Sequence, residues 1–264
     1  MANSPSGESV INRVIRLLAA FRDESPAMSL RQLARMAELP ISTAHRLAAE
    51  LEVEGLLVRD DAGKLRHGHR LWEIASRGSR ASSLREAALP YMEELVNQTG
   101  NDVSLGVIEG VDVLYLERLT VDDSSKNITK IAGRLPIHGC SAGLIYMAFA
   151  PEAERERFLS RRLEKLTPDT VVDPVELRAL LARAKERGFV SVGGIIVPEA
   201  SGVSVPVFGA DGQVLAMLTL ILDRGEENLA ANLPQLTFAS RAISLRLGFE
   251  PERKGIRRKS APAS

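Results

Sequence analysis

Four side chains between Ser42 and Arg46 have the chemistry needed to read duplex DNA. The stretch Ser42-Thr43-Ala44-His45-Arg46 supplies hydroxyls, an imidazole and a guanidinium on one predicted helix. Hydroxyls and backbone N–H groups at a helix start suit a phosphate oxygen. An arginine one turn further on can read guanine through O6 and N7. The alternative interpretation is a solvated helix face that contacts nothing.

The flanking sequence predicts a helix-turn-helix. Ser29 with Gln32 three residues later is a capping-box pattern at the start of one helix. Residues 38–40 form the turn, and a second helix runs over residues 41–54 until Gly55 ends it. A helix in this position is the one that enters the major groove.

A hairpin and an earlier helix complete the predicted DNA-binding domain. A helix begins at Ser9, and residues 56–59 and 64–67 alternate as two strands around an Asp/Gly turn. This order is typical of a winged helix-turn-helix, with Lys64 and Arg66 as wing contacts. The candidate DNA-binding residues are Arg31, Ser42, Thr43, His45, Arg46, Lys64 and Arg66.

The composition limits how this chain could bind DNA. It has 264 residues, 45% of them apolar, and its 34 Lys and Arg balance 34 Asp and Glu. A DNA-binding protein with no net charge must concentrate positive charge locally, because phosphate attraction is screened. The polar N-terminus, the single cysteine and the lack of a membrane-length apolar run predict a cytoplasmic protein without disulfides or membrane contact.

The second half predicts an α+β domain. Alternating segments read as antiparallel strands, including a possible strand within residues 124–135, and amphipathic segments read as helices between them. The predicted organisation is a disordered tail (1–8), a winged helix-turn-helix (9–69), a linker helix region (70–88), an effector domain (89–248) and a basic disordered tail (249–264).

Other groups with chemical potential favour no catalysis. His138 and Cys140 could form a thiol–imidazole pair, but no third orienting group is visible, and a metal site needs more ligands. Asp122-Asp123 lacks spaced partners, and Gly193-Gly194 fits a bend better than a phosphate loop. We therefore expect neither an enzyme nor a cofactor or metal.

Several motifs in both halves agree in order and spacing with one family. They are Ser9-Val10, Leu39-Pro40-x-Ser42-Thr43-x-His45-Arg46-Leu47, Gly133-Arg134-Leu135-Pro136-Ile137-His138, Arg187-Gly188-Phe189 and Val205-Pro206-Val207-Phe208. From Ser9 to about Leu247 the chain resembles the IclR family of bacterial transcriptional regulators. The resemblance implies a winged helix, a dimerising linker helix and a GAF-like effector domain.

The resemblance also implies partners and a ligand site. Such regulators bind palindromic operators as homodimers or homotetramers, and they control catabolic or transport operons in response to small organic or aromatic compounds. Matching the motifs places the effector between two walls. The residues of these walls are Leu135, Cys140, Ser141 and Ala142 on one side and Val192, Gly202, Thr219 and Ile221 on the other.

Departures from the family pattern bear on the ligand and on the turn. Residues 192–195 lack the acidic residues common in the family, Leu144 replaces a usual Lys, and Ile221 replaces a polar residue. These changes predict a less polar cavity and a larger or more apolar ligand than a two-carbon acid, or a ligand with no carboxylate. Glu38 stands where the family often has Gly, which is costly if the turn needs positive φ.

The sequence thus predicts a ligand-responsive DNA-binding regulator. Two alternatives built on the same two domains stay open, an enzyme acting in the effector cavity and a protein–protein adaptor. Turnover of a ligand would favour the first, and absence of DNA binding at low salt would favour the second.

Overall fold

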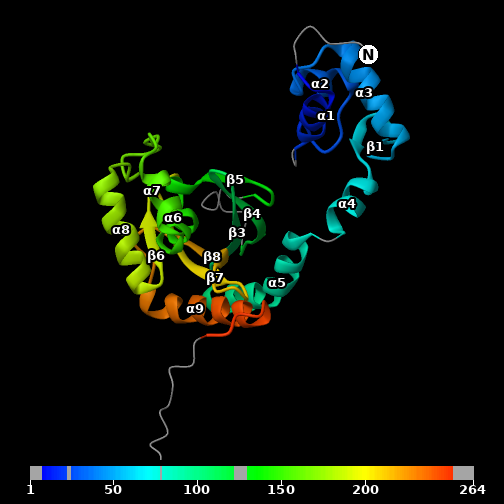
Figure 1. Cartoon of the computed structure of the whole chain (residues 1–264). Helices are drawn as coiled ribbons and strands as arrows, with labels where there is room; N and C mark the ends of the chain where they lie inside the picture. The colour runs from blue at the N-terminus through cyan, green and yellow to red at the C-terminus, as the bar shows by residue number, and fades with distance from the viewer. Residues whose placement is uncertain (1–7, 23–24, 78, 122–129, 252–264) are drawn as a thin grey trace, which may run out of the picture. The chain divides into compact units, whose positions relative to one another are not determined.

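The computed structural model describes residues 8–22, 25–77, 79–121 and 130–251, which contacts divide into two compact units, 1–80 and 81–264 (Figure 1). The predicted tails fall wholly or largely outside the described residues, as do Asp122-Asp123 and the first half of the strand proposed within 124–135. No helix in the described ranges is long and apolar enough to cross a membrane.

The first unit is a winged helix. Its elements are α1 (Val10–Ala19), α2 (Leu30–Met36), α3 (Ile41–Val53), β1 (Leu57–Arg59), β2 (Leu65–His67) and α4 (His69–Ser76). Ser9 caps α1 through the N–H of Asn12. The capping box predicted at α2 is confirmed, because Ser29 and Gln32 exchange side chain–backbone hydrogen bonds.

A small apolar core holds the three helices and the hairpin together. Leu17, Leu33 and Leu47, one from each helix, have at most 1% of their surface exposed, and Leu57 and Leu65 of the hairpin have none exposed. The backbones of Met28 and Leu65 also exchange hydrogen bonds of 2.9 and 2.8 Å. The segment before α2 is thereby joined to the wing.

The second unit is a three-layer α+β domain. Its antiparallel six-stranded sheet has the order β5-β4-β3-β8-β7-β6. The strands are β3 (Asp102–Glu109), β4 (Asp112–Leu119), β5 (Arg134–Pro136), β6 (Val190–Gly193), β7 (Ala200–Phe208) and β8 (Val214–Asp223). In the described part of the strand expected over 124–135, the structure has only the short β5. The strand that the sequence pattern predicts over residues 189–196 ends as β6 at Gly193.

Helices cover both faces of this sheet (Figure 1). The helices are α5 (Arg80–Thr99), α6 (Ser141–Phe149), α7 (Glu152–Leu159), α8 (Pro174–Arg187) and α9 (Leu229–Arg246), with a 3-10 turn, η1 (Ile137–Gly139), before α6. One core joins α6, α7 and α8 to the sheet, and a second joins α5 and α9 to it. Because side chains alternate along a strand, Val203 and Val205 face the second core, whereas Gly202 and Ser204 face α6.

The turn between α2 and α3 forces Glu38 into the left-handed region. Its φ is +53°, so the condition under which Glu38 is costly in this turn is met. The Leu39 N–H donates to the Ala34 carbonyl at 2.9 Å, and the Glu38 N–H donates to the Arg35 carbonyl at 3.1 Å. These two bonds form a Schellman motif, in which glycine is the usual residue with positive φ.

Glu38→Gly should therefore stabilise the winged helix. Relief of left-handed strain, about 1–2 kcal/mol, exceeds the extra unfolded-state entropy of glycine, about 0.4–1 kcal/mol. We expect amide hydrogen exchange in α2 and α3 of the full chain to slow about two- to fivefold. Glu38→Ala is the control, because it removes the carboxylate but keeps the Cβ. If exchange slows equally in both variants, the gain in stability comes from removing the carboxylate, and the strain at Glu38 is not its cause.

Candidate functional site

The outer face of α3 presents the predicted DNA-reading residues to solvent. Ser42, His45 and Arg46 are exposed and Thr43 is half-buried, whereas Ala44 between them is fully buried and anchors the helix. The Arg46 guanidinium donates to the Glu50 carboxylate at 2.9 Å, one turn along the helix. Exposed ion pairs of this kind stabilise little, so Arg46 can exchange this partner for a nucleotide at small cost.

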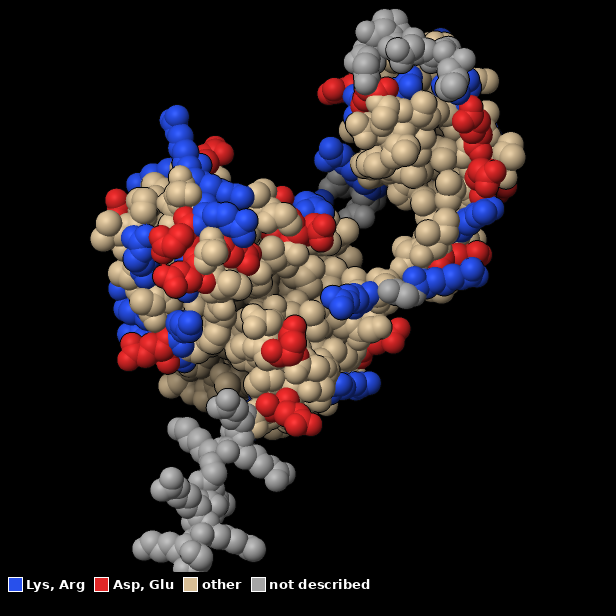
Figure 2. All heavy atoms as spheres, viewed as in Figure 1, with Lys and Arg blue, Asp and Glu red and all other residues tan. Residues whose placement is uncertain are grey.

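Acidic residues mark the second half of α3. Glu50, Glu52 and Glu54 follow one another along the helix, and Figure 2 shows acidic side chains gathered there. Arg59 of β1 makes two 2.9 Å hydrogen bonds to the carboxylate of Glu52, and Arg70 lies 3.7 Å from Glu54. These carboxylates would repel phosphates, so the N-terminal half of α3 is the part suited to approach DNA.

The wing adds two cations beside this face. Asp60 accepts hydrogen bonds from the N–H groups of Ala62 and Lys64 and so shapes the tip of the hairpin. Lys64 and Arg66 are exposed, while Leu65 between them is buried, so both cations lie on the outer face of β2.

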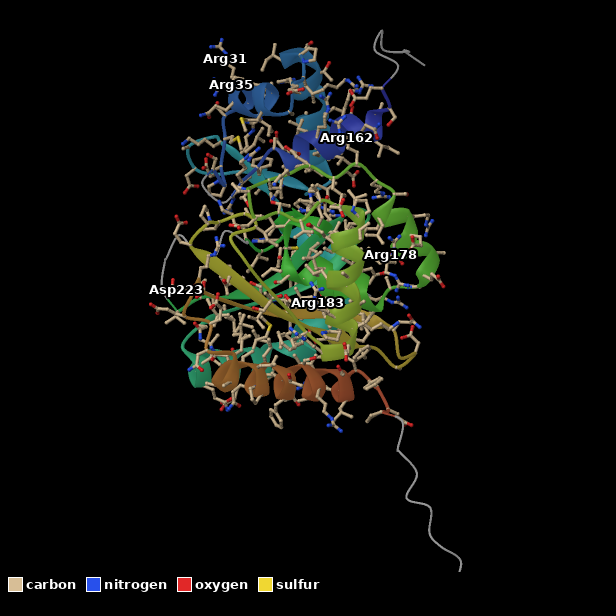
Figure 3. All side chains as sticks on the ribbon, turned by 90° about the vertical axis from the view of Figure 1, so that its left-hand side faces the viewer. Arg31, Arg35, Arg162, Arg178, Arg183 and Asp223 are labelled. Carbon is tan, nitrogen blue, oxygen red and sulfur yellow. The ribbon has the colours of Figure 1, made fainter. Side chains whose placement is uncertain are left out.

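Helix α2 supplies a pair of arginines. Arg31 is exposed, and Arg35, one turn later, projects on the same side of α2 (Figure 3). Sequence reasoning named Arg31 and missed Arg35, although their i, i+4 spacing signals a shared helix face.

The second unit contains a cavity at the start of α6. It encloses about 490 Å³, its open mouth included. Seven of the eight predicted effector residues line it, namely Leu135, Cys140, Ser141, Val192, Gly202, Thr219 and Ile221. Ala142 does not: it has no exposed surface and belongs to the core between α6 and its neighbours. Its side chain therefore forms no part of the lining. The role predicted for Ala142 is to hold a carboxylate through its backbone N–H, and that role stays a prediction.

A chain of hydroxyls crosses the inner end of this cavity. The Ser204 hydroxyl donates to that of Ser141 at 2.7 Å and lies 2.6 Å from that of Thr219. A Cβ at Gly202 would lie 2.5 Å from the Ser141 hydroxyl, so glycine at this position leaves room for that side chain. The start of α6 is thus hydrogen-bonded to β7 and β8.

Cys140 and Tyr115 are uncharged members of the wall. The Cys140 sulfur caps α6 by accepting the Gly143 N–H at 3.4 Å. Burial raises the pKa of Cys140 to about 11, and burial beside Cys140 raises the pKa of Tyr115 well above its ordinary value. Both groups are protonated at neutral pH, and none of the described residues lining the cavity carries a charge.

His138 makes a hydrogen bond that serves the architecture. Its Nε2 lies 2.8 Å from the carbonyl oxygen of Glu164, so the ring ties η1 to the chain between α7 and α8. Within the described residues, no group of three or more His, Cys, Asp or Glu could hold a metal ion.

The segment 194–199 closes one side of the cavity and is held from outside. The hydroxyls of Thr167 and Thr170 donate to its carbonyls at 2.7 and 3.2 Å. Arg224 donates to Asp169 at 2.7 Å and to a third carbonyl of the segment at 3.3 Å. The hydrogen bond from Arg224 lowers the pKa of Asp169, so this pair stays charged at neutral pH.

Sequence reasoning missed seven lining residues, which come from this segment, β4, η1 and the start of β7. The additional lining residues are Tyr115, Gly139, Ile195, Ile196, Val197, Ala200 and Ser201. Strand alternation from Val113 could have pointed to Tyr115, since both face the core of α6. The sequence pattern predicts a strand over residues 189–196, whereas β6 ends at Gly193 and the apolar residues 195–197 line the cavity.

A winged helix with an open reading face, followed by an α+β unit with a neutral cavity, defines a class: DNA-binding regulators that respond to a small molecule. The chain belongs to the IclR family of bacterial transcriptional regulators. The IclR helix-turn-helix domain matches residues 10–61, and the bacterial transcriptional regulator IclR C-terminal domain matches residues 79–245.

Relatives of known role are transcriptional regulators. The HTH-type transcriptional regulator XynR of Escherichia coli is 26% identical over 90% of this chain and 97% of its own. The Pca regulon regulatory protein of Pseudomonas putida is 25% identical over 82% of this chain and 75% of its own. The crystal structure of an IclR homolog from Microbacterium hydrocarbonoxydans, complexed with 4-hydroxybenzoate, is 39% identical with a TM-score of 0.84, covering 90% and 99% of the two chains.

The raised pKa of Cys140 predicts a slow, pH-dependent alkylation. Because Cys140 is the only cysteine, one mass adduct reports on this site alone. In the folded chain we expect its reaction with iodoacetamide to rise about tenfold per pH unit from about pH 8 to about pH 10, since only the thiolate reacts. The chain unfolded in guanidinium is the control and should level off near pH 9. If the alkylation rate of the folded chain also levels off near pH 9, the pKa of Cys140 is not raised.

Proposed function

We propose that this regulator senses an aromatic monocarboxylic acid of the 4-hydroxybenzoate class and adjusts the transcription of a catabolic operon accordingly. The observation that carries the proposal is the cavity at the start of α6, with apolar walls, a hydroxyl chain and no charged lining residue among those described. The 39% identity to the Microbacterium homolog, which binds 4-hydroxybenzoate, supports the same ligand class.

The walls suit the ring, and the helix start suits the carboxylate. Leu135, Val192 and Ile221 offer apolar contact from opposite sides. The hydroxyls of Ser141 and Thr219, with the backbone N–H at the start of α6, supply dipoles that favour an anion. Because no cation lines the cavity, these dipoles orient the carboxylate while burial of the ring provides most of the affinity.

On the DNA side, Arg46 and His45 reach base edges, and Ser42 and Thr43 hold phosphates at the start of α3. Arg31, Lys64 and Arg66 clamp the flanking DNA backbone.

The protein acts as a homodimer or homotetramer on paired half-sites in the cytoplasm and has no catalytic turnover. Exposed Trp72 and Ile74 on α4, with 73% and 59% of their surfaces accessible, support a self-association surface.

Ligand and DNA binding are coupled by a population shift. The effector must bind two arrangements of the oligomer with different affinities, and those arrangements must present the two winged helices differently to the operator. The proposed organisation, a DNA-binding domain over 9–69, a linker over 70–88 and an effector domain over 89–248, places the linker where such a change would act.

Two variants test the ligand site. Ser141→Phe fills the cavity and should abolish the thermal shift caused by 4-hydroxybenzoate, while DNA binding persists and an unchanged circular dichroism spectrum shows that the second unit is folded. Thr219→Val keeps the shape, removes one hydroxyl, and should weaken binding about tenfold. A full thermal shift in Ser141→Phe would show that the ligand binds elsewhere. Consumption of 4-hydroxybenzoate by the wild-type protein would favour an enzyme.

A matched pair of substitutions tests the DNA-reading face. On a duplex selected from a random library, Arg46→Ala should lose about 1–3 kcal/mol while binding to scrambled DNA changes little, because Arg46 reads a base. Lys64→Ala should weaken binding to both duplexes alike. It should also reduce the slope of log affinity against log salt concentration by about one. If both variants lose the same affinity on both duplexes, α3 contacts the backbone only and Arg46 is not a reader. Binding to neither duplex by the wild-type chain at low salt would favour the adaptor.

A further inference from the structure

The second unit has another cavity, larger than the one at the start of α6. It lies between the end of β7, the second half of α9 and residues 249–251, and it encloses about 840 Å³ including its open mouth. No residue lines both cavities. This space is therefore not an extension of the effector site and has no role in the function proposed above.

Three phenyl rings form one wall of this second cavity. Phe149 at the end of α6 meets Phe208 of β7 edge-on, with ring centroids 5.6 Å apart. Phe208 stacks on Phe249, with centroids 5.1 Å apart and planes 26° from parallel. Rings from three separate segments thus make a continuous aromatic surface, which favours a flat apolar group.

Among the polar side chains that line the second cavity, one charged group can pair with a ligand. The Ser240 hydroxyl donates to the Pro206 carbonyl at 2.5 Å, and the Ser244 hydroxyl accepts the Phe208 N–H at 2.9 Å, so both serines serve the fold. Arg241 is the one charged residue among the described lining residues. It is exposed, and it makes no ion pair or hydrogen bond within the part of the chain that the structure describes.

We propose that this cavity is a second small-molecule site, for an amphipathic organic anion with an aromatic body. The body lies against Phe208 and Phe249, and its carboxylate or sulfonate pairs with the Arg241 guanidinium. Charge-assisted hydrogen bonds to arginine are stronger than neutral ones, and a largely apolar concavity with one polar anchor is the usual form of a ligand site.

The probe for this site is 8-anilinonaphthalene-1-sulfonate, an aromatic anion that fluoresces in apolar surroundings. The full chain is titrated in the Ser141→Phe background, which closes the effector cavity, with circular dichroism to verify the native fold. If that variant does not fold, Val192→Trp, which fills the same cavity from β6, takes its place in every comparison. We expect one dye molecule per chain. Arg241→Gln should raise the dissociation constant at least fivefold. The matched control is Arg246→Gln, because Arg246 is an exposed arginine of α9 that does not line the cavity. This substitution should leave the dissociation constant unchanged.

A further substitution tests the cavity without touching the charge. Thr237→Trp, at an exposed lining position on α9, should obstruct the space and abolish dye binding. The proposal is overturned if the Ser141→Phe variant binds no dye, if Arg241→Gln and Arg246→Gln have equal affinities, or if Thr237→Trp binds as well as its parent. None of these results depends on whether 4-hydroxybenzoate binds, so this proposal and the proposed function fail separately.

Discussion

The close approach of α6 to its neighbours is the constraint on which the ligand-binding unit depends. A Cβ at Gly143 would lie 2.1 Å from the Ile137 carbonyl oxygen, so the first turn of α6 rests directly on the backbone of η1. On the other side the Ser141 hydroxyl occupies the space left by the missing side chain of Gly202. These two contacts fix where α6 begins, and the cavity is the space that remains between that point and the sheet.

The local chemistry of the sequence was sufficient to predict the winged helix. The capping box at Ser29, the turn before α3 and the Asp/Gly hairpin each act over a few residues, and the structure shows all three. The resemblance to a family brought half of the cavity residues together, since it carries tertiary information that periodicity lacks. Local pattern alone gave no contact between residues far apart, such as Ser141 with Ser204.

The features that the sequence did not predict depend on the direction of side chains and on contacts between residues far apart in the chain. Successive residues of a helix point about 100° apart, so the Ala142 side chain turns into the core while that of Ser141 reaches β7. Ala142 can then meet a ligand only through its backbone N–H, as predicted for it. Residues 195–197 were apolar enough for a strand, but Thr167, Thr170 and Arg224 hold this segment over the cavity. That arrangement follows from side chains 24 or more positions away in the sequence, which no window of neighbouring residues contains.

The neutrality of the cavity decides which property of a ligand supplies its affinity. A carboxylate moved out of water needs compensation, and here only hydroxyl and backbone dipoles are at hand, because Cys140 and Tyr115 remain protonated at neutral pH. A two-carbon acid has little apolar surface with which to offset that desolvation, whereas an aromatic ring buries enough against Leu135, Val192 and Ile221. The uncharged lining is therefore the feature that supports the proposed aromatic ligand over the smallest acids. Since no fixed charge takes part, the affinity for such a ligand should depend weakly on salt, in contrast to binding of DNA phosphates by Arg and Lys.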